Sequence, residues 1–181
     1  MSIKDRGNRY GGLSIVTHWL IAILVMGMLA FGLTIEDLPK SDTADDLIAI
    51  HKSIGILVLL LAVWRILWRV FNGFPEEIAA MRPWQQVAAR AVHYALILGV
   101  LAMPLSGYVG SAAAGYPVDF FGMFSLPTLP KSKLLASIAG ETHEILGMLL
   151  IVLIALHALA ALKHHFIDRD GTLKRMLGRT W

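Results

Sequence analysis

Two histidines, His143 and His157, lie fourteen residues apart within one apolar stretch of the chain. At about 3.6 residues per turn this spacing is close to four helical turns, so both imidazoles are expected on one helix face, roughly 21 Å apart along the axis. A neutral imidazole is a strong metal ligand, and an ionisable side chain at membrane depth indicates a functional site. The spacing therefore predicts two metal-ligating positions at different depths of one helix.

Two further histidines, His18 and His51, lie near the ends of other apolar segments. In an antiparallel bundle His18 reaches the depth of His157, here called the inner level. His51 and His143 each open an apolar segment from the opposite side, here called the outer level. Facing helices that offer one histidine each are how a bundle holds a haem. We therefore expect two haem irons, one bound by His18 and His157 and the other by His51 and His143.

The absence of cysteine limits what these histidines can bind. A chain without cysteine has no disulfide, no iron–sulfur cluster, no thiolate ligand and no covalent c-type haem. Haem must therefore be held without a covalent bond, as haem b is. A zinc site is a weaker alternative, because neither pair is accompanied by carboxylate or thiolate ligands. Another alternative is that each histidine is an isolated interfacial residue.

Small residues follow each of the four histidines. Gly55 comes four residues after His51, Gly147 comes four after His143, and the inner pair has alanine at the same offset. A residue at this offset lies one turn away on the same helix face, where a bulky side chain would collide with a porphyrin. The pattern predicts a flat slot beside each pair, although small residues are also common where membrane helices pack.

The composition predicts the elements that carry the histidines. Of 181 residues, 56% are hydrophobic and only 16% are charged, with a mean hydropathy of +0.64. This balance favours an integral membrane protein in a lipid bilayer. We expect an all-α four-helix bundle forming one domain over residues 1–181, with spans at about 13–35, 51–71, 88–112 and 143–163. Arg65 and Arg69 close the second span and can snorkel to the interface.

The basic residues predict the orientation and exclude nucleic acid as a partner. They gather at span ends rather than on a polar face. One side of a four-span chain holds twelve of them and the other only Lys40, Lys52, Lys131 and Lys133. Both termini are therefore expected in the cytoplasm. The first segment could instead be a signal peptide, but its apolar run is long and lacks a cleavage motif.

Two features are open to two interpretations, and the histidines after the last span have one expected place. The semi-apolar connection over residues 111–140 is either a lid with a short helix or an ordinary loop. His93 lies near the inner level, where it could compete with His18 as a ligand or stand beside a quinone. His164 and His165 follow the last span and are expected in a solvated basic tail.

The chain resembles the bacterial cytochrome b561 family from Tyr10 to about Met176. The resemblance rests on an ordered set of motifs: Ser14-Ile-Val-Thr-His18-Trp19-Leu20, Ile50-His51, His93, Met103-Pro104-Leu-Ser-Gly107, His143-Glu144, Ala155-Leu-His157-Ala158, Ala161-Leu-Lys-His164-His165-Phe and Asp170-Gly-Thr-Leu-Lys-Arg175-Met. It implies two b-type haems on the same two histidine pairs and a location in the bacterial inner membrane. It also implies electron transfer to the quinone pool.

Members similar to this chain are assigned superoxide oxidation at the outer face, with ubiquinone as acceptor. We therefore expect a superoxide:ubiquinone oxidoreductase. Superoxide is an anion, and Lys52, Lys131 and Lys133 are the candidates to attract it, the last two from the long outer loop. The alternative is a membrane-anchor subunit that carries electrons between a partner dehydrogenase or hydrogenase and the quinone pool. A structural bundle without cofactor is a third possibility.

Overall fold

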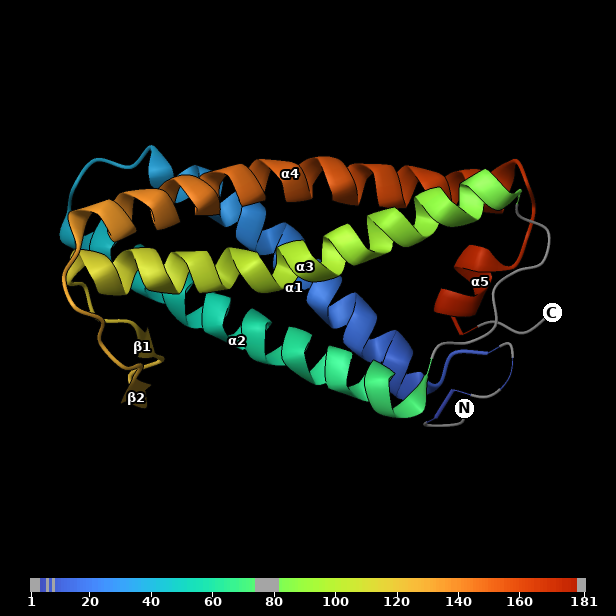
Figure 1. Ribbon diagram of the computed structural model, residues 1–181, viewed down its shortest axis with the longest axis horizontal. Helices are drawn as coiled ribbons and strands as arrows, with labels where there is room; N and C mark the ends of the chain where they lie inside the picture. Colours follow the sequence, from blue (N-terminus) through green and yellow to red (C-terminus); the bar gives the residue numbers. More distant parts are fainter. Residues whose placement is uncertain (1–3, 6, 8, 74–81, 179–181) are drawn as a thin grey trace.

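The computed structural model describes residues 4, 5, 7, 9–73 and 82–178. Four long helices form an elongated bundle (Figure 1). The elements in chain order are α1 (Gly12–Glu36), α2 (Asp42–Asn72), α3 (Pro83–Ala114), β1 (Asp119–Phe120), β2 (Phe124–Ser125), α4 (Lys133–Phe166) and α5 (Thr172–Met176). All four long helices have the length and apolar composition needed to cross a membrane. The expected all-α membrane four-helix bundle is confirmed.

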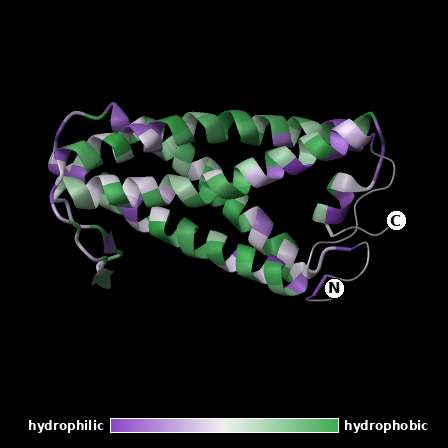
Figure 2. Ribbon diagram, viewed as in Figure 1, coloured by the Kyte–Doolittle hydropathy of each residue, from purple (hydrophilic) through white to green (hydrophobic). Residues whose placement is uncertain are grey.

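The surface of the bundle is apolar where a bilayer would surround it. Hydrophobic residues fill the middle of the long helices and polar residues gather near their ends (Figure 2). Large apolar side chains of α4 point outward along its length: Ile145, Met148, Leu149, Val152, Leu156 and Leu159. An apolar face this long is stable in contact with lipid chains and would be an aggregation surface in water.

Two helices begin earlier than the apolar runs predict. Helix α2 starts at Asp42, where the Ser41 hydroxyl accepts a hydrogen bond from the Ala44 amide at 3.2 Å. Helix α4 starts at Lys133, and the hydroxyl of Ser132 accepts from the Leu135 amide at 3.3 Å. These serine caps satisfy amides that a helix start leaves free, so a polar first turn is stable. His51 and His143 consequently lie inside their helices rather than opening them.

The core of the bundle lies between the two histidine levels. Helix α3 packs along α4 and α1 packs along α2, while α2 also contacts α3. Five buried apolar side chains from three helices form one cluster: Ile21, Val25, Leu29, Val58 and Leu150. Because α1 contributes three of these residues between His18 and the outer level, the cluster separates the two levels with packed hydrocarbon.

The connection between α3 and α4 holds a short antiparallel hairpin instead of a helix. Strands β1 and β2 pair Asp119 with Ser125. The hairpin is tied to α2 through Ser53, whose hydroxyl lies 2.8 Å from the carbonyl oxygen of Asp119 and accepts from the amide of Phe121 at 3.1 Å. The short helix expected for a lid is therefore absent from the described residues 115–132, and the hairpin covers the outer end of α2.

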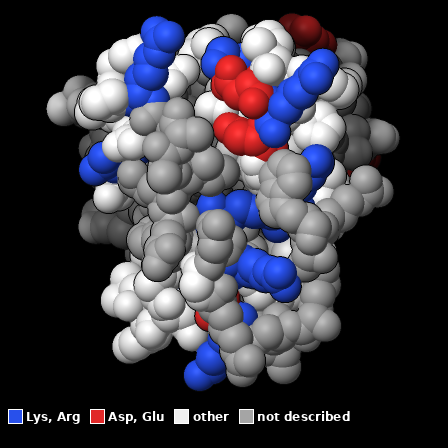
Figure 3. Space-filling view, turned by 90° about the vertical axis from the view of Figure 1, so that its right-hand side faces the viewer, with Lys and Arg blue, Asp and Glu red and all other residues white. Residues whose placement is uncertain are grey.

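The chain enters α1 and leaves α5 at the same end of the bundle (Figure 1). Viewed onto this end, Lys and Arg side chains are spread over the surface, with fewer acidic groups among them (Figure 3). Helix α5 folds back toward α1, where the indole nitrogen of Trp19 donates to the carbonyl oxygen of Met176 at 2.9 Å. The basic end that the sequence indicates is thus one contiguous end of the structure.

Candidate functional site

The structure brings the two outer histidines together from different helices. The ring centroids of His51 on α2 and His143 on α4 are 6.2 Å apart. Two imidazoles on opposite sides of one metal ion have centroids about 6.3 Å apart, given a metal–nitrogen bond of about 2.0–2.1 Å and a ring nitrogen about 1.1 Å from its centroid. The outer pair therefore has the separation of two ligands to one iron.

The inner pair has the same separation. The ring centroids of His18 on α1 and His157 on α4 lie 6.3 Å apart. His93 on α3 is also beside His157, but at a centroid distance of only 5.3 Å. This distance is about 1 Å short of the ligand separation derived above. Of the two candidates to face His157 across an iron, the geometry favours His18, and His93 is a neighbour of the site.

The surroundings of the outer pair suit a flat, largely apolar group with a metal. A cavity between the helices is bordered by both histidines and by apolar or small residues: Val25, Met28, Gly55, Val58, Val100, Met103, Pro104 and Leu150. The Nδ1 atom of His51 is buried there and has no hydrogen-bond partner in the described part of the chain. A buried polar atom left in this way is a feature that a bound group or its polar substituents can satisfy.

The fixed orientation of His143 comes from a backbone carbonyl of α3. Its Nδ1 atom lies 2.8 Å from the carbonyl oxygen of Met103, which also accepts from the Ser106 hydroxyl at 2.7 Å. A carbonyl only accepts, so Nδ1 carries the proton and Nε2 is left for a metal. The sequence cannot predict this partner, because every residue has a backbone carbonyl and nothing in the residue type marks the one that His143 contacts.

Glycines on neighbouring helices make room for two of the histidine rings. A Cβ atom on Gly107 would lie 3.0 Å from Nδ1 and Cε1 of His143, and one on Gly32 would lie 3.4 Å from Cε1 of His51. Neither glycine follows from the four-residue offset, because each lies on a different helix from the histidine it touches. Cross-helix contacts of this kind depend on helix rotation, which the sequence does not fix.

The two glycines that the offset does select differ in their surroundings. A Cβ on Gly55 would meet nothing within 4 Å, and Gly55 borders the outer cavity. A Cβ on Gly147 would touch Met103 at 3.5 Å and Leu29 at 4.0 Å. Gly55 therefore leaves open space beside the outer pair, whereas Gly147 lies in contact with neighbouring helices.

Arg65 and Arg69 point into the protein instead of snorkelling outward. Arg65 donates through Nη1 to the carbonyl oxygen of Ser14 at 2.9 Å, and its Nη2 lies 3.4 Å from Nδ1 of His18. Arg69 is 8% exposed and forms a buried ion pair with Asp5. The interfacial interpretation is wrong for both residues, because polar partners from the N-terminal segment and α1 compensate them inside the bundle.

The three lysines expected to attract superoxide have different surroundings. Lys52 is half-buried and directs Nζ to the carbonyl oxygen of Pro117, 3.4 Å away, with the Tyr116 ring centroid at 5.5 Å. Lys131 is exposed, and its side chain lies against Gly115, where a Cβ atom would collide with it. Lys133 is the first residue of α4 rather than part of the loop. Lys52 is the lysine that directly follows a histidine of the outer pair.

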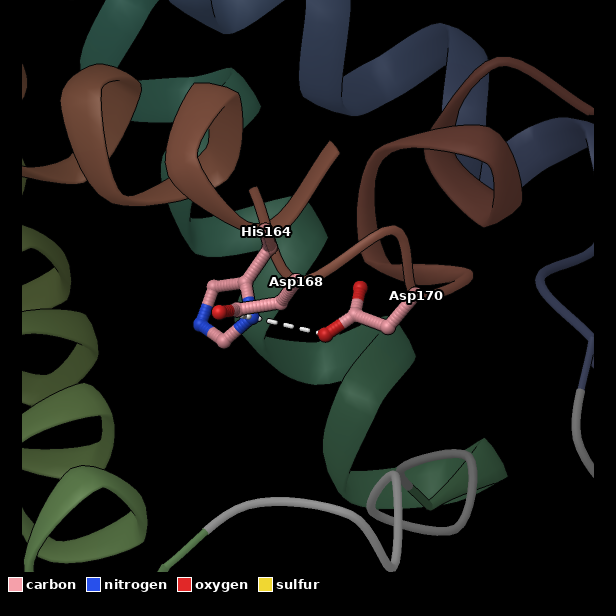
Figure 4. A group of neighbouring side chains, drawn as sticks. All are labelled: His164, Asp168 and Asp170. Carbon is pink, nitrogen blue, oxygen red and sulfur yellow. Dashed lines mark hydrogen bonds and ion pairs between the residues drawn. The ribbon is translucent and has the colours of Figure 1, made fainter. Parts of the chain in front are cut away.

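His164 lies in the last helical turn of α4, next to the ordered turn that leads to α5, and its side chain is only 13% exposed instead of lying in a solvated tail. Figure 4 shows His164 and Asp170 turned toward one another, with Nδ1 2.7 Å from the carboxylate, and Asp168 beside them. Asp168 also binds Lys163 at 2.6 Å, and Asp170 accepts from the amide of Thr172 at 2.8 Å. Partial burial raises the pKa of Asp170, but the bonds from Thr172 and His164 outweigh it, so the net pKa is below its usual value. The network joins α4 to α5.

Comparisons with known proteins cover nearly the whole chain. The family described as prokaryotic cytochrome b561 matches residues 9–179. Cytochrome b561 homolog 2 of Escherichia coli (strain K12) is 44% identical, over 99% of this chain and 97% of the homolog. Cytochrome b561 homolog 1 of the same organism is 30% identical, over 95% and 98%. The probable superoxide oxidase CybB of Yersinia pestis is 29% identical, over 93% and 96%.

Proposed function

Because the chain belongs to the prokaryotic cytochrome b561 family, it is a haem b membrane protein of electron transfer, and we propose that it is a superoxide:ubiquinone oxidoreductase with two haems. The observation that carries the proposal is the pair of imidazole separations, 6.2 Å at the outer level and 6.3 Å at the inner level. We assign His51 and His143 to the outer iron and His18 and His157 to the inner iron. Bound at these positions, the haems supply one-electron carriers at two depths of the membrane.

The protein's own residues orient the ligands and keep water out. The carbonyl oxygen of Met103 fixes the His143 ring, and Gly107 leaves space for it. Between the levels the cluster around Leu150, which is only 1% exposed, lines the interior with hydrocarbon, including one wall of the cavity beside the outer pair. An apolar interior offers ions and water few polar partners, so electrons can cross without an accompanying leak.

The outer face has a candidate for collecting superoxide. Lys52 follows His51 directly, and a positive charge beside the outer level attracts a small anion before any chemistry occurs. Each superoxide loses one electron and leaves as dioxygen. Two such electrons and two protons convert one ubiquinone to ubiquinol. The donor side therefore needs no nucleophile and no acid or base, and one relative is itself named a probable superoxide oxidase.

The orientation completes the proposal. We place the basic end, where α1 begins and α5 ends, in the cytoplasm, because cytoplasmic loops of inner-membrane proteins are rich in Lys and Arg. The outer level then faces the periplasm. Ubiquinone is proposed to accept electrons near the inner level, where His93 adjoins His157.

The test is a quinone-reduction assay on the detergent-purified protein. Enzymatically generated superoxide and a soluble ubiquinone analogue are supplied, and ubiquinol formation is followed with and without superoxide dismutase. We expect dismutase-sensitive ubiquinol formation by the wild type and its loss in His143→Ala. Two haems per chain that superoxide fails to reduce, together with co-purification of a dehydrogenase, would replace the proposal by the membrane-anchor function.

A further inference from the structure

The two histidine levels differ in the group that faces one imidazole. At the outer level, Nδ1 of His143 lies 2.8 Å from a carbonyl oxygen. At the inner level, Nδ1 of His18 lies 3.4 Å from Nη2 of Arg65. A carbonyl accepts the hydrogen bond from Nδ1–H and makes the imidazole a more basic ligand. A guanidinium only donates, so beside an imidazole bound through Nε2 it forms no hydrogen bond to Nδ1–H and acts through its fixed charge alone. The outer ligand is therefore made more electron-rich, while the inner ligand faces a fixed positive charge.

The hydrogen-bond partners of Arg65 in the described part of the chain are uncharged, so they do not neutralise its positive charge. Its Nη1 donates to the carbonyl oxygen of Ser14 at 2.9 Å and to the hydroxyl of Thr17 at 3.1 Å. The carboxylate of Asp5 is engaged by Arg69, with which it forms a buried ion pair. Asp5 and Arg69 together are close to neutral, so Arg65 contributes about one positive charge beside His18. A half-buried charge is screened by salt much less than a surface charge.

The outer level also has a cation nearby, but it is directed to the loop. Lys52 directs Nζ away to the carbonyl oxygen of Pro117, at the edge of the covering loop. The printed polar contact of this ammonium group is thus with the loop backbone, whereas Arg65 reaches a histidine ring. A positive charge therefore lies in direct contact with a histidine of the inner pair, while the lysine next to the outer pair contacts the covering loop.

We propose that Arg65 holds the reduction potential of the inner haem above that of the outer haem, so that an electron settles at the inner level. The inference rests on the proposed function, since it requires a haem on each histidine pair. A nearby positive charge favours the reduced iron, which carries one positive charge less, and a more basic ligand favours the oxidised iron. The transfer moves one electron inward and involves no proton and no bond change. Arg65 is a positioning and tuning residue that acts through His18.

The test is an optical redox titration of the purified two-haem protein. Arg65→Met keeps an unbranched apolar stem and removes the charge, while Arg65→Lys keeps the charge. Changing a group next to a metal-ligating histidine typically alters metal affinity or activity by about 10–100-fold, and the lower end of that range sets the expectation here. We expect Arg65→Met to shift the sharing of the electron between the two haems about tenfold toward the outer one, which is about 59 mV for a one-electron couple. Arg65→Lys should retain most of the wild-type gap.

Two controls make the outcome specific. Gly107→Ala, which crowds His143, alters the spectrum of the outer haem and so identifies it in the titration. Lys52→Met should leave the inner potential unchanged. The inference is overturned if the haem identified as outer has the higher potential in the wild type, or if Arg65→Met leaves the gap unchanged. If Arg65→Met fails to hold the inner haem, the wild-type order and Arg65→Lys still decide. A count below two haems per chain would refute the proposed function instead.

Discussion

Replacing Gly107 with alanine should weaken the outer haem site and spare the inner one. The added Cβ would lie 3.0 Å from both Nδ1 and Cε1 of His143. Ordinary van der Waals contact begins near 3.4 Å, so the imidazole has to move by roughly 0.4 Å or more. That movement strains the 2.8 Å contact between Nδ1 and the Met103 carbonyl, which holds the ring in place. Loss of such a contact typically lowers metal affinity about 10–100-fold.

A matched substitution separates this effect from a general change in the helix. Gly27 lies in α1, and a Cβ there meets nothing within 4 Å. Alanine is favoured over glycine in a helix by about 0.8–1.0 kcal/mol, so Gly27→Ala should be neutral or stabilising. Both variants are assayed by pyridine haemochrome and by haem release to excess apomyoglobin. Wild-type release kinetics of both haems in Gly107→Ala would show that His143 does not hold an iron in the orientation described.

Three further outcomes are expected. His18→Ala should abolish one low-spin haem signal in electron paramagnetic resonance while His93→Ala keeps both, and the reverse result would assign the inner ligand to His93. Lys52→Glu should slow haem reduction by superoxide several-fold and flatten its salt dependence while quinol-driven reduction is unchanged, because the Debye length at 0.15 M salt is about 8 Å; a rate insensitive to both salt and Lys52 would remove the superoxide reaction. Because the pKa of Asp170 is lowered in the folded protein, its carboxylate stabilises the turn above the unfolded pKa of about 3.9, and this contribution is lost as the pH falls through the folded pKa. The difference in melting temperature between wild type and Asp170→Asn should therefore shrink on acidification, and a pH-independent difference would contradict the assignment.

The helices and the meeting of the histidines follow from the sequence for identifiable reasons. Long apolar runs report membrane helices because lipid offers the backbone no hydrogen bonds. The fourteen-residue spacing of His143 and His157 places both on one face, since it is nearly a whole number of turns. Antiparallel helices of known span then leave few partners at each depth, and the structure does bring His18 and His51 to them.

The parts that the sequence could not predict depend on rotation and on backbone atoms. Helix α2 extends through a polar first turn, which hydropathy alone reads as a loop. The contact between Gly107 and His143 depends on how α3 is rotated against α4. The position of Arg65 and Arg69 near the end of a span suggests interfacial arginines. In the structure Asp5 of the N-terminal segment pairs with Arg69, and Arg65 turns inward to the Ser14 carbonyl. Each of these features arises from segments distant in sequence.

Helix α4 supplies one histidine to each level, so this helix alone fixes the distance between the two sites. The vertical gap between the two sites is set by the pitch of one continuous helix, whatever the other three helices do. A single inserted residue between His143 and His157 would turn one imidazole by about 100° away from its partner. Over evolutionary time this stretch should therefore accept many exchanges of one apolar residue for another, and almost no change of length.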